Sequence, residues 1–142
     1  MDELKLKMGD YNIVIPLDSL NTILIGDGNT GKSCLFKKLK EAVNNGEISG
    51  TFLFIDSTTM YNIDHIKTIK ADLVVIDDFD YVKAMHPEIV TYLNKYKPRA
   101  LIMGRDVFML CSNKHYVFTV SVNEAKKTWD LEPLLPNNIP WL

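Results

Sequence analysis

The chain has 142 residues, of which 46% are hydrophobic and 24% charged, and this balance predicts one globular domain with a core of ordinary size. A formal net charge of −2 provides no overall basic field, which disfavours strong non-specific binding to nucleic acid. No apolar run approaches the roughly 20 residues that span a bilayer, and the widely spaced Cys34 and Cys111 fit reduced thiols. We therefore expect a cytoplasmic domain that is neither exported nor embedded in a membrane.

An N-terminal β-hairpin is expected within residues 1–20, because apolar and polar residues alternate on both sides of Gly9-Asp10. A short apolar strand at 22–25 follows. The next apolar stripe has helical spacing and stops at Asn45-Gly46, where glycine accepts the left-handed conformation that ends a helix.

Strands and helices continue to alternate through a core of residues 21–122. The expected elements are a strand at 51–55, a weak helix at 63–69, a buried strand at 73–76, a helix opened by Pro87, strands at 100–103 and 116–122, and an edge piece at 107–110. A last helix is expected at 123–131, capped by Asn123, before a proline-containing tail that ends at residue 142.

Repeated strand and helix units of this length are typical of a mainly parallel sheet with right-handed crossovers. Strands without polar alternation are covered on both faces. The predicted fold class is therefore α/β, with a mainly parallel sheet of about five strands, helices on both faces and the hairpin before it. The whole chain, 1–142, is expected to form one domain.

A phosphate-binding loop is predicted at residues 26–33, which read Gly26-Asp27-Gly28-Asn29-Thr30-Gly31-Lys32-Ser33 and match the pattern G-x-x-x-x-G-K-[ST]. Glycines let the backbone N–H groups curl inward around phosphate oxygens. Lys32 can reach the β and γ phosphates, and the Ser33 hydroxyl can ligate magnesium. The following helix adds its positive N-terminal dipole. A glycine-rich turn that matches by chance is the alternative, and the position between a strand and a helix argues against it.

A second acidic motif follows the apolar run 73–76, which ends in Asp77 and Asp78. A buried strand of this kind delivers carboxylates to the edge of an α/β sheet where ligands bind. Asp77 can hold magnesium directly or through water. The alternative is that the two aspartates simply cap a helix or a turn. The predicted phosphate loop earlier in the chain argues against this alternative.

Together these segments resemble the Walker A and Walker B motifs of the P-loop NTPases, over roughly residues 22–122. In the branch that includes AAA+, RecA-like and ABC ATPases, Walker B usually ends in Asp-Glu, and the Glu polarises the attacking water. The resemblance implies that role for Asp78. Because Asp is one methylene shorter than Glu, we expect slow hydrolysis, with Asp80 a weaker candidate for the same role.

The hairpin also looks like the antiparallel layer that precedes the phosphate loop in ABC-type and RecF-like ATPases. In ABC transporters an aromatic residue there stacks on adenine, which makes Tyr11 the candidate for that contact. An ordinary hairpin aromatic is the alternative. The chain has no L-S-G-G-Q signature, which argues against a sandwich dimer of the ABC kind.

Arg105 follows the strand at 100–103 and is expected at the same edge as the phosphate loop, whereas Arg99 opens that strand at the opposite edge. Arg105 is similar in position to sensor 1 of AAA+ proteins. It is a candidate for contacting the γ-phosphate or for acting as an arginine finger on a neighbouring subunit. A surface charge is the alternative.

The sequence thus predicts a minimal ATPase with ATP and Mg²⁺ as cofactors. Catalytic roles fall to Lys32, Asp78 and Arg105, and metal binding to Ser33 and Asp77. A nucleotide-binding switch or assembly module with little turnover is the main alternative. A small-molecule kinase and a GTPase are weaker, because the chain has only two arginines and Tyr116 replaces the base-reading Asp of the GTPase motif.

A homo-oligomer or a protein partner is compatible with the sequence. Weak nucleic-acid binding is the remaining possibility, through basic residues interleaved with aromatic ones. These residues are Lys37, Lys38, Tyr92, Tyr96, Lys97, Lys126 and Lys127.

Overall fold

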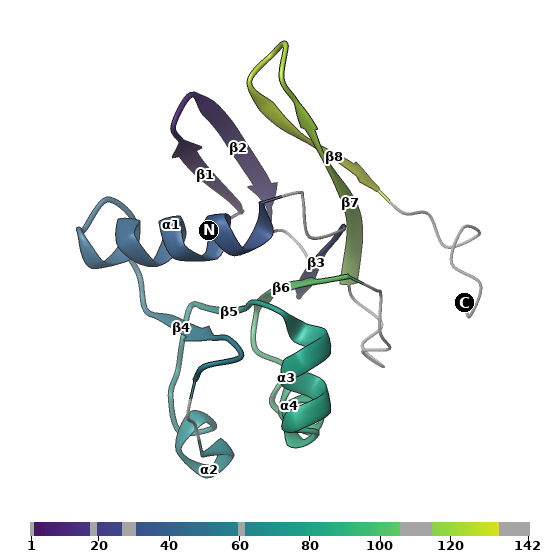
Figure 1. Ribbon diagram of the computed structural model, residues 1–142. Coiled ribbons are helices and arrows are strands. Elements are labelled where there is room, and N and C mark those ends of the chain that lie inside the picture. The colour runs from purple at the N-terminus through teal and green to yellow at the C-terminus, as the bar shows by residue number, and fades with distance from the viewer. Residues whose placement is uncertain (1, 18–19, 27–30, 60–61, 106–114, 134–142) are drawn as a thin grey trace.

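The computed structural model describes residues 2–17, 20–26, 31–59, 62–105 and 115–133. The strands in these ranges are β1 (Glu3–Met8), β2 (Tyr11–Pro16), β3 (Asn21–Ile25), β4 (Phe52–Ile55), β5 (Leu73–Ile76), β6 (Ala100–Gly104), β7 (His115–Asn123) and β8 (Thr128–Pro133). The helices are α1 (Lys32–Asn44), α2 (Ile63–Ile66), α3 (Phe79–Met85) and α4 (Glu88–Tyr96). Figure 1 shows α1 on one side of a curled sheet and α3 and α4 on the other.

The fold class predicted from the sequence was wrong. Instead of about five mainly parallel strands, the described residues form one mixed sheet of eight strands, in the order β1-β2-β8-β7-β3-β6-β5-β4. The pairs β1–β2 and β7–β8 are antiparallel, while the other neighbours run parallel. The N-terminal hairpin was expected and is present. It is not a separate layer, however, because β2 joins β8 through Asn12 and Thr128.

The helix expected at 123–131 is also wrong, because this segment turns back and forms β8 against β7. Asn123 does cap a backbone group, but its Oδ1 accepts the N–H of Lys126 at 3.0 Å within a tight turn. Lys127 has a φ of 54°, which ends any helical path. Trp129 and Leu131 then alternate with polar residues, as in a strand with one buried face. The tail at 134–142 and the edge piece expected at 107–110 lie outside the described residues.

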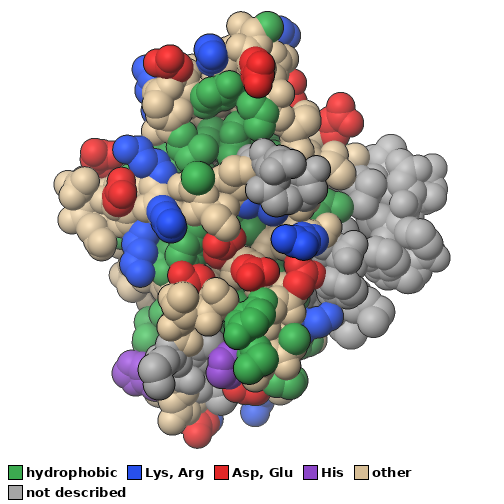
Figure 2. All heavy atoms as spheres, viewed as in Figure 1, with side chains coloured by type: hydrophobic (Ala, Val, Ile, Leu, Met, Phe, Trp, Pro, Cys, Tyr) green, Lys and Arg blue, Asp and Glu red, His purple; other side chains and the backbone are tan. Residues whose placement is uncertain are grey.

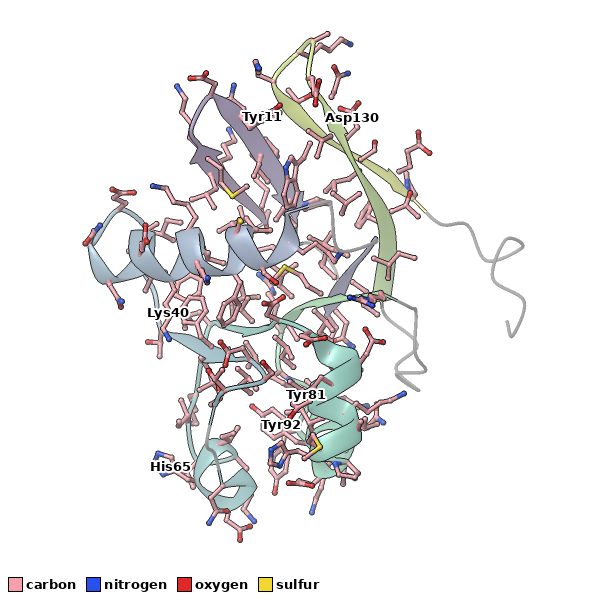
Figure 3. All side chains as sticks on the ribbon, viewed as in Figure 1. Tyr11, Lys40, His65, Tyr81, Tyr92 and Asp130 are labelled. Carbon is pink, nitrogen blue, oxygen red and sulfur yellow. The ribbon has the colours of Figure 1, made fainter. Side chains whose placement is uncertain are left out.

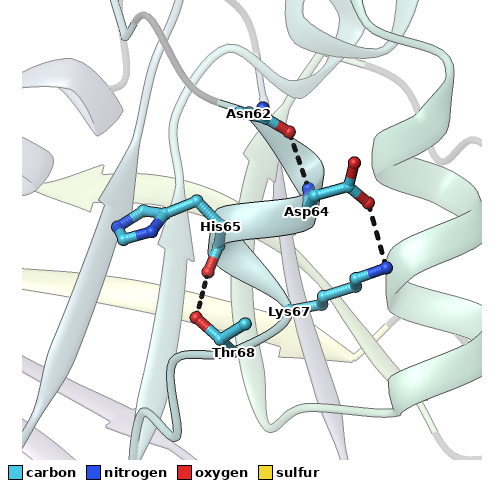
Figure 4. Close-up of polar contacts among 5 residues, drawn as sticks. All are labelled: Asn62, Asp64, His65, Lys67 and Thr68. Atoms are coloured by element: carbon cyan, nitrogen blue, oxygen red, sulfur yellow. Dashed lines mark hydrogen bonds and ion pairs between the residues drawn. The ribbon is translucent and has the colours of Figure 1, made fainter.

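Two of the expected helices, α1 and α4, are confirmed, and α3 was not expected. The weak helix expected at 63–69 is the single turn α2. Figure 4 shows the local bonds that hold it. The Asn62 Oδ1 accepts the N–H of Asp64 at 2.8 Å, Lys67 pairs with Asp64 at 2.9 Å, and the Thr68 hydroxyl donates to the His65 carbonyl at 2.6 Å. Polar bonds of this kind cap a short turn but do not extend it.

The sheet divides the apolar side chains into two clusters, one on each face. In β5, Val74 and Ile76 belong to the cluster under α3 and α4, while Leu73 and Val75 belong to the cluster under α1. All four are fully buried, so each contributes roughly 1.5–3 kcal/mol relative to exposure. The apolar run that looked like a doubly covered strand is confirmed as one. Among the described helices, none is long and apolar enough to cross a membrane.

Candidate nucleotide-binding site

The site lies where three neighbouring parallel strands end. β3 and β6 are in register up to Ile25 and Gly104, and β5 and β6 up to Ile76 and Ile102. Because parallel strands share an edge at their carboxyl ends, the segments that follow β3, β5 and β6 meet there. These segments carry the start of the phosphate loop, the two aspartates and Arg105.

A cavity of about 210 Å³ opens at this edge. It is lined by Gly31, Lys32, Ser33, Cys34, Asp77, Asp78, Met103, Gly104 and Arg105. Figure 2 shows acidic and basic side chains side by side in the middle of this face, with hydrophobic surface above and below them. The described end of the phosphate loop, both aspartates and Arg105 therefore line a single cavity, as the sequence predicted.

The two described ends of the phosphate loop are held together. Gly31 has a φ of 80° and precedes α1, so a residue with a Cβ would be strained there. Lys32 is 8% exposed, and its Nζ donates to the Gly26 carbonyl at 2.7 Å. This bond reaches from the last part of the loop back to its first residue. Asp27, Gly28, Asn29 and Thr30 lie outside the described residues.

The Ser33 hydroxyl is hydrogen-bonded to the Asp77 carboxylate, which joins the phosphate loop to the end of β5. Burial raises the pKa of Asp77 above its ordinary value of 3.8, while hydrogen bonds from Ser33 and from the backbone N–H of Asp78 oppose that shift. The nearby charges of Asp78 and Asp56 raise the pKa further. Burial thus disfavours the negative charge of Asp77, and a positive charge placed in the cavity would favour it.

Asp78 adopts a left-handed backbone conformation, with φ 52° and ψ 54°, and it precedes the first turn of α3. Its side chain is exposed at the cavity. Asp and Asn tolerate this conformation better than longer side chains do. The backbone at this position therefore suits Asp better than the longer Glu.

The structure does not bring Tyr11 to the cavity. Figure 3 shows Tyr11 towards the tips of the two hairpins, well away from α3. The Lys127 ammonium lies 5.2 Å from the centre of its ring, and the ring packs against the cluster under α1. These contacts match the alternative interpretation, an aromatic residue that belongs to the hairpin.

Sequence reasoning missed Trp129, which is 7% exposed. Its Cζ2 atom lies 3.4 Å from the place where a Cβ on Gly31 would sit, so the indole lies beside Gly31. The alternation of apolar and polar residues in 128–133 was the signal that could have found it.

Asp56, which directly follows β4, was also missed. Burial raises its pKa, but hydrogen bonds from Thr58 and Thr59, aided by the charge of Lys40, leave the pKa below 3.8. Its charge in turn acts on Asp77. The signal was its place after an apolar strand, the same position that drew attention to Asp77.

Within the part of the chain that the structure describes, no group of three or more His, Cys, Asp or Glu side chains could hold a metal ion by itself. Mg²⁺ does not need such a group, because it keeps several waters and takes one or two protein oxygens together with substrate phosphates. Ser33 and Asp77 offer two oxygens of this kind, already in contact.

Comparison of the sequence with models of known protein families and with curated protein sequences gives no match. No family membership is therefore shown for this chain.

Proposed function

We propose that the chain binds ATP with Mg²⁺ in this cavity and hydrolyses it slowly, through segments of the Walker A and Walker B kind found in P-loop NTPases. The observation that carries the proposal is the hydrogen bond between Ser33 and Asp77, in a cavity that Lys32 also lines. A loop serine held against a carboxylate at a strand end is the pair of groups that Mg-nucleotide binding requires.

Phosphate binding is supported by the charges and dipoles at the cavity. Lys32 and Arg105 bring two positive side chains, and α1 begins at the cavity with its positive dipole end. The Nζ of Lys32 is already directed across the loop to Gly26. We expect this ammonium to exchange the Gly26 carbonyl for phosphate oxygens when nucleotide binds.

Magnesium fits the site through Ser33 and Asp77. When bound, Mg²⁺ neutralises charge on the β and γ phosphates. The raised pKa of Asp77 reflects a negative charge that burial disfavours, and a cation beside the carboxylate removes that penalty. The oxygen ligands and the electrostatics of the cavity therefore both favour binding of Mg²⁺.

Asp78 is the proposed group that activates the attacking water, since its carboxylate lines the cavity and is exposed. Its short side chain and fixed backbone conformation support slow turnover, because general-base catalysis depends on close approach to the water. Arg105 is the proposed contact for the γ-phosphate. A cytoplasmic location accompanies this proposal, because Cys34 is an exposed thiol that forms no disulfide within the described residues.

Hydrolysis is tested by single-turnover release of phosphate, with protein in excess over ATP and with Mg²⁺. We expect measurable release by the wild type and a loss of roughly 100-fold or more in Asp78→Asn, as for removal of a general base. Asp64→Asn, on the exposed side of α2, is the matched control and should behave as the wild type. Equal turnover in Asp78→Asn and the wild type would remove Asp78 from the mechanism.

A nucleotide-binding switch with little turnover is the second candidate, favoured by the left-handed backbone that holds a short carboxylate at position 78. Tight binding of ATP without phosphate release by the wild type would support the switch over the ATPase. Competition between ATP and GTP for binding tests the expected preference for adenine. This preference is abandoned if GTP displaces ATP at equal concentration.

A further inference from the structure

Asp80, in the first turn of α3, connects that helix to the end of β6. Its Oδ2 accepts a hydrogen bond from the backbone N–H of Arg105 at 2.7 Å. β5 pairs with β6 only as far as Ile76 and Ile102, and the chain then turns through Asp78 into α3. The backbone N–H of Arg105 lies past the end of this strand pairing. The Asp80 carboxylate, which belongs to a helix, is its hydrogen-bond acceptor.

This bond closes a rigid connection between two residues of the cavity. Phe79 and Val82 pack in the same cluster as Ile102, which fixes the apolar face of α3 on the sheet beneath β6. The bond from Asp80 then fixes the backbone of Arg105 relative to that helix. Because α3 begins directly after Asp78, the backbone of Arg105 is also fixed relative to Asp78.

The second oxygen of the same carboxylate adds no further hydrogen bond within the described residues. The Asp80 Oδ1 is buried, and among the described residues it has no hydrogen-bond partner. An unsatisfied buried oxygen costs folding free energy, and in native proteins it calls for an explanation. A group that serves the site at some expense of stability provides one.

We propose that Asp80 is a positioning residue, which holds Arg105 at a fixed place relative to Asp78 through its acceptor oxygen. Asp80 does not line the cavity, so it acts through the backbone of Arg105 and not on the nucleotide. This inference rests on the proposed function, because it assigns to Asp80 the alignment of that reaction. It differs from a role for Asp80 as a substitute general base.

Two variants separate these roles. Asp80→Asn keeps an oxygen that can accept the Arg105 N–H but removes the negative charge, whereas Asp80→Ala removes the acceptor. Asp64→Ala is the matched control, because it deletes an equally charged side chain from the exposed surface of α2. Melting temperatures of all variants are recorded, since the amide nitrogen of Asn would occupy the place of the unsatisfied oxygen.

The first measurement is turnover and ATP affinity under single-turnover conditions. We expect Asp80→Ala to lower the rate constant of hydrolysis roughly ten-fold or more, because small misplacements of catalytic groups are costly, while ATP affinity changes less than about three-fold. Asp80→Asn should restore most of the rate. Loss of activity in both variants would overturn the proposal in favour of a role for the charge, and wild-type rates in Asp80→Ala would overturn it outright.

The second measurement is amide hydrogen exchange of Arg105, followed by NMR in the nucleotide-free protein. Protection of this amide in the wild type and Asp80→Asn, with at least roughly ten-fold faster exchange in Asp80→Ala, supports the proposal. Unchanged exchange in Asp80→Ala overturns it. This measurement needs no hydrolysis, so failure of the proposed function, seen as absent ATP binding by the wild type, is distinguished from failure of the role of Asp80.

Discussion

The cavity and the hairpin end of the sheet differ in the kinds of residues that build them. At the cavity, polar and charged side chains follow the strand ends, the backbone is left-handed at Gly31 and Asp78, and burial disfavours the charge of Asp77. At the hairpin end, alternating apolar residues fill the cluster under α1. Trp129 belongs to the hairpin end and touches the phosphate loop, so it is where the two meet. We therefore expect the hairpins to stabilise the cavity through Trp129, because left-handed backbone and a buried charge both cost folding free energy.

The largest expected effect on stability comes from removing this link. We expect Trp129→Ala to lower the free energy of unfolding by about 3–5 kcal/mol, because it deletes a large buried side chain and leaves a cavity. Urea denaturation measures the loss. Trp129→Phe should retain most of the stability, since an aromatic ring still fills the space. A loss below about 1 kcal/mol in the alanine variant would show that the hairpin end does not support the loop.

A smaller effect is expected from the glycine that Trp129 contacts. Gly31→Ala should cost about 1–2 kcal/mol, because a side chain is strained at a φ of 80°. Gly46 has a similar φ of 76° and open space around it, so Gly46→Ala is a matched control with a similar loss of stability. Only Gly31→Ala should also weaken ATP binding. Equal ATP affinity in the two variants would show that the backbone conformation of Gly31 does not contribute to ATP binding.

The smallest expected effect is a gain of stability at the cavity. The pKa of Asp77 is raised in the folded protein, so its ionised form opposes folding at neutral pH. Asp77→Asn keeps an acceptor for Ser33 and removes that charge. The variant should therefore melt at a higher temperature than the wild type at pH 7 without nucleotide, and bind Mg-ATP more weakly.

The gap between the two melting temperatures should close as the pH falls through the raised pKa of Asp77 to below 3.8, where the carboxyl group is protonated in both folded and unfolded chains. Thermal unfolding across this pH range checks the sign. A wild type that is more stable than Asp77→Asn at pH 7 would contradict the interpretation that burial penalises this charge.

Position along the chain predicted much of the cavity from the sequence. Asp77 and Arg105 each follow a short apolar run, and Lys32 follows a glycine turn. The carboxyl ends of neighbouring parallel strands meet at one edge of a sheet, however many other strands the sheet contains. Asp56 obeys the same rule and was overlooked. The left-handed conformation of Asp78 was not predictable, because it depends on how α3 packs on the sheet.

The number of strands in the sheet could not be predicted from positions along the chain. Asn123 begins either a helix or a turn, and its side-chain bond to the N–H of Lys126 suits both. What decides for the turn is tertiary: Trp129 pairs with Val122 and is buried in the cluster under α1. The pairing of Asn12 with Thr128, supported by the hydrogen bond from the Asn12 N–H to the Lys127 carbonyl, then makes both hairpins part of one sheet.

The proposed binding of Mg-ATP by Lys32 and its neighbours is tested by calorimetric titration. We expect saturable binding by the wild type and by Lys38→Ala, a control on the exposed side of α1. Lys32→Ala should bind at least roughly 30-fold more weakly, because loss of a close charge contact costs about 2–5 kcal/mol. Absence of binding in the wild type would exclude a Mg-ATP site in this cavity, and equal affinity in Lys32→Ala would exclude a role for Lys32 in it.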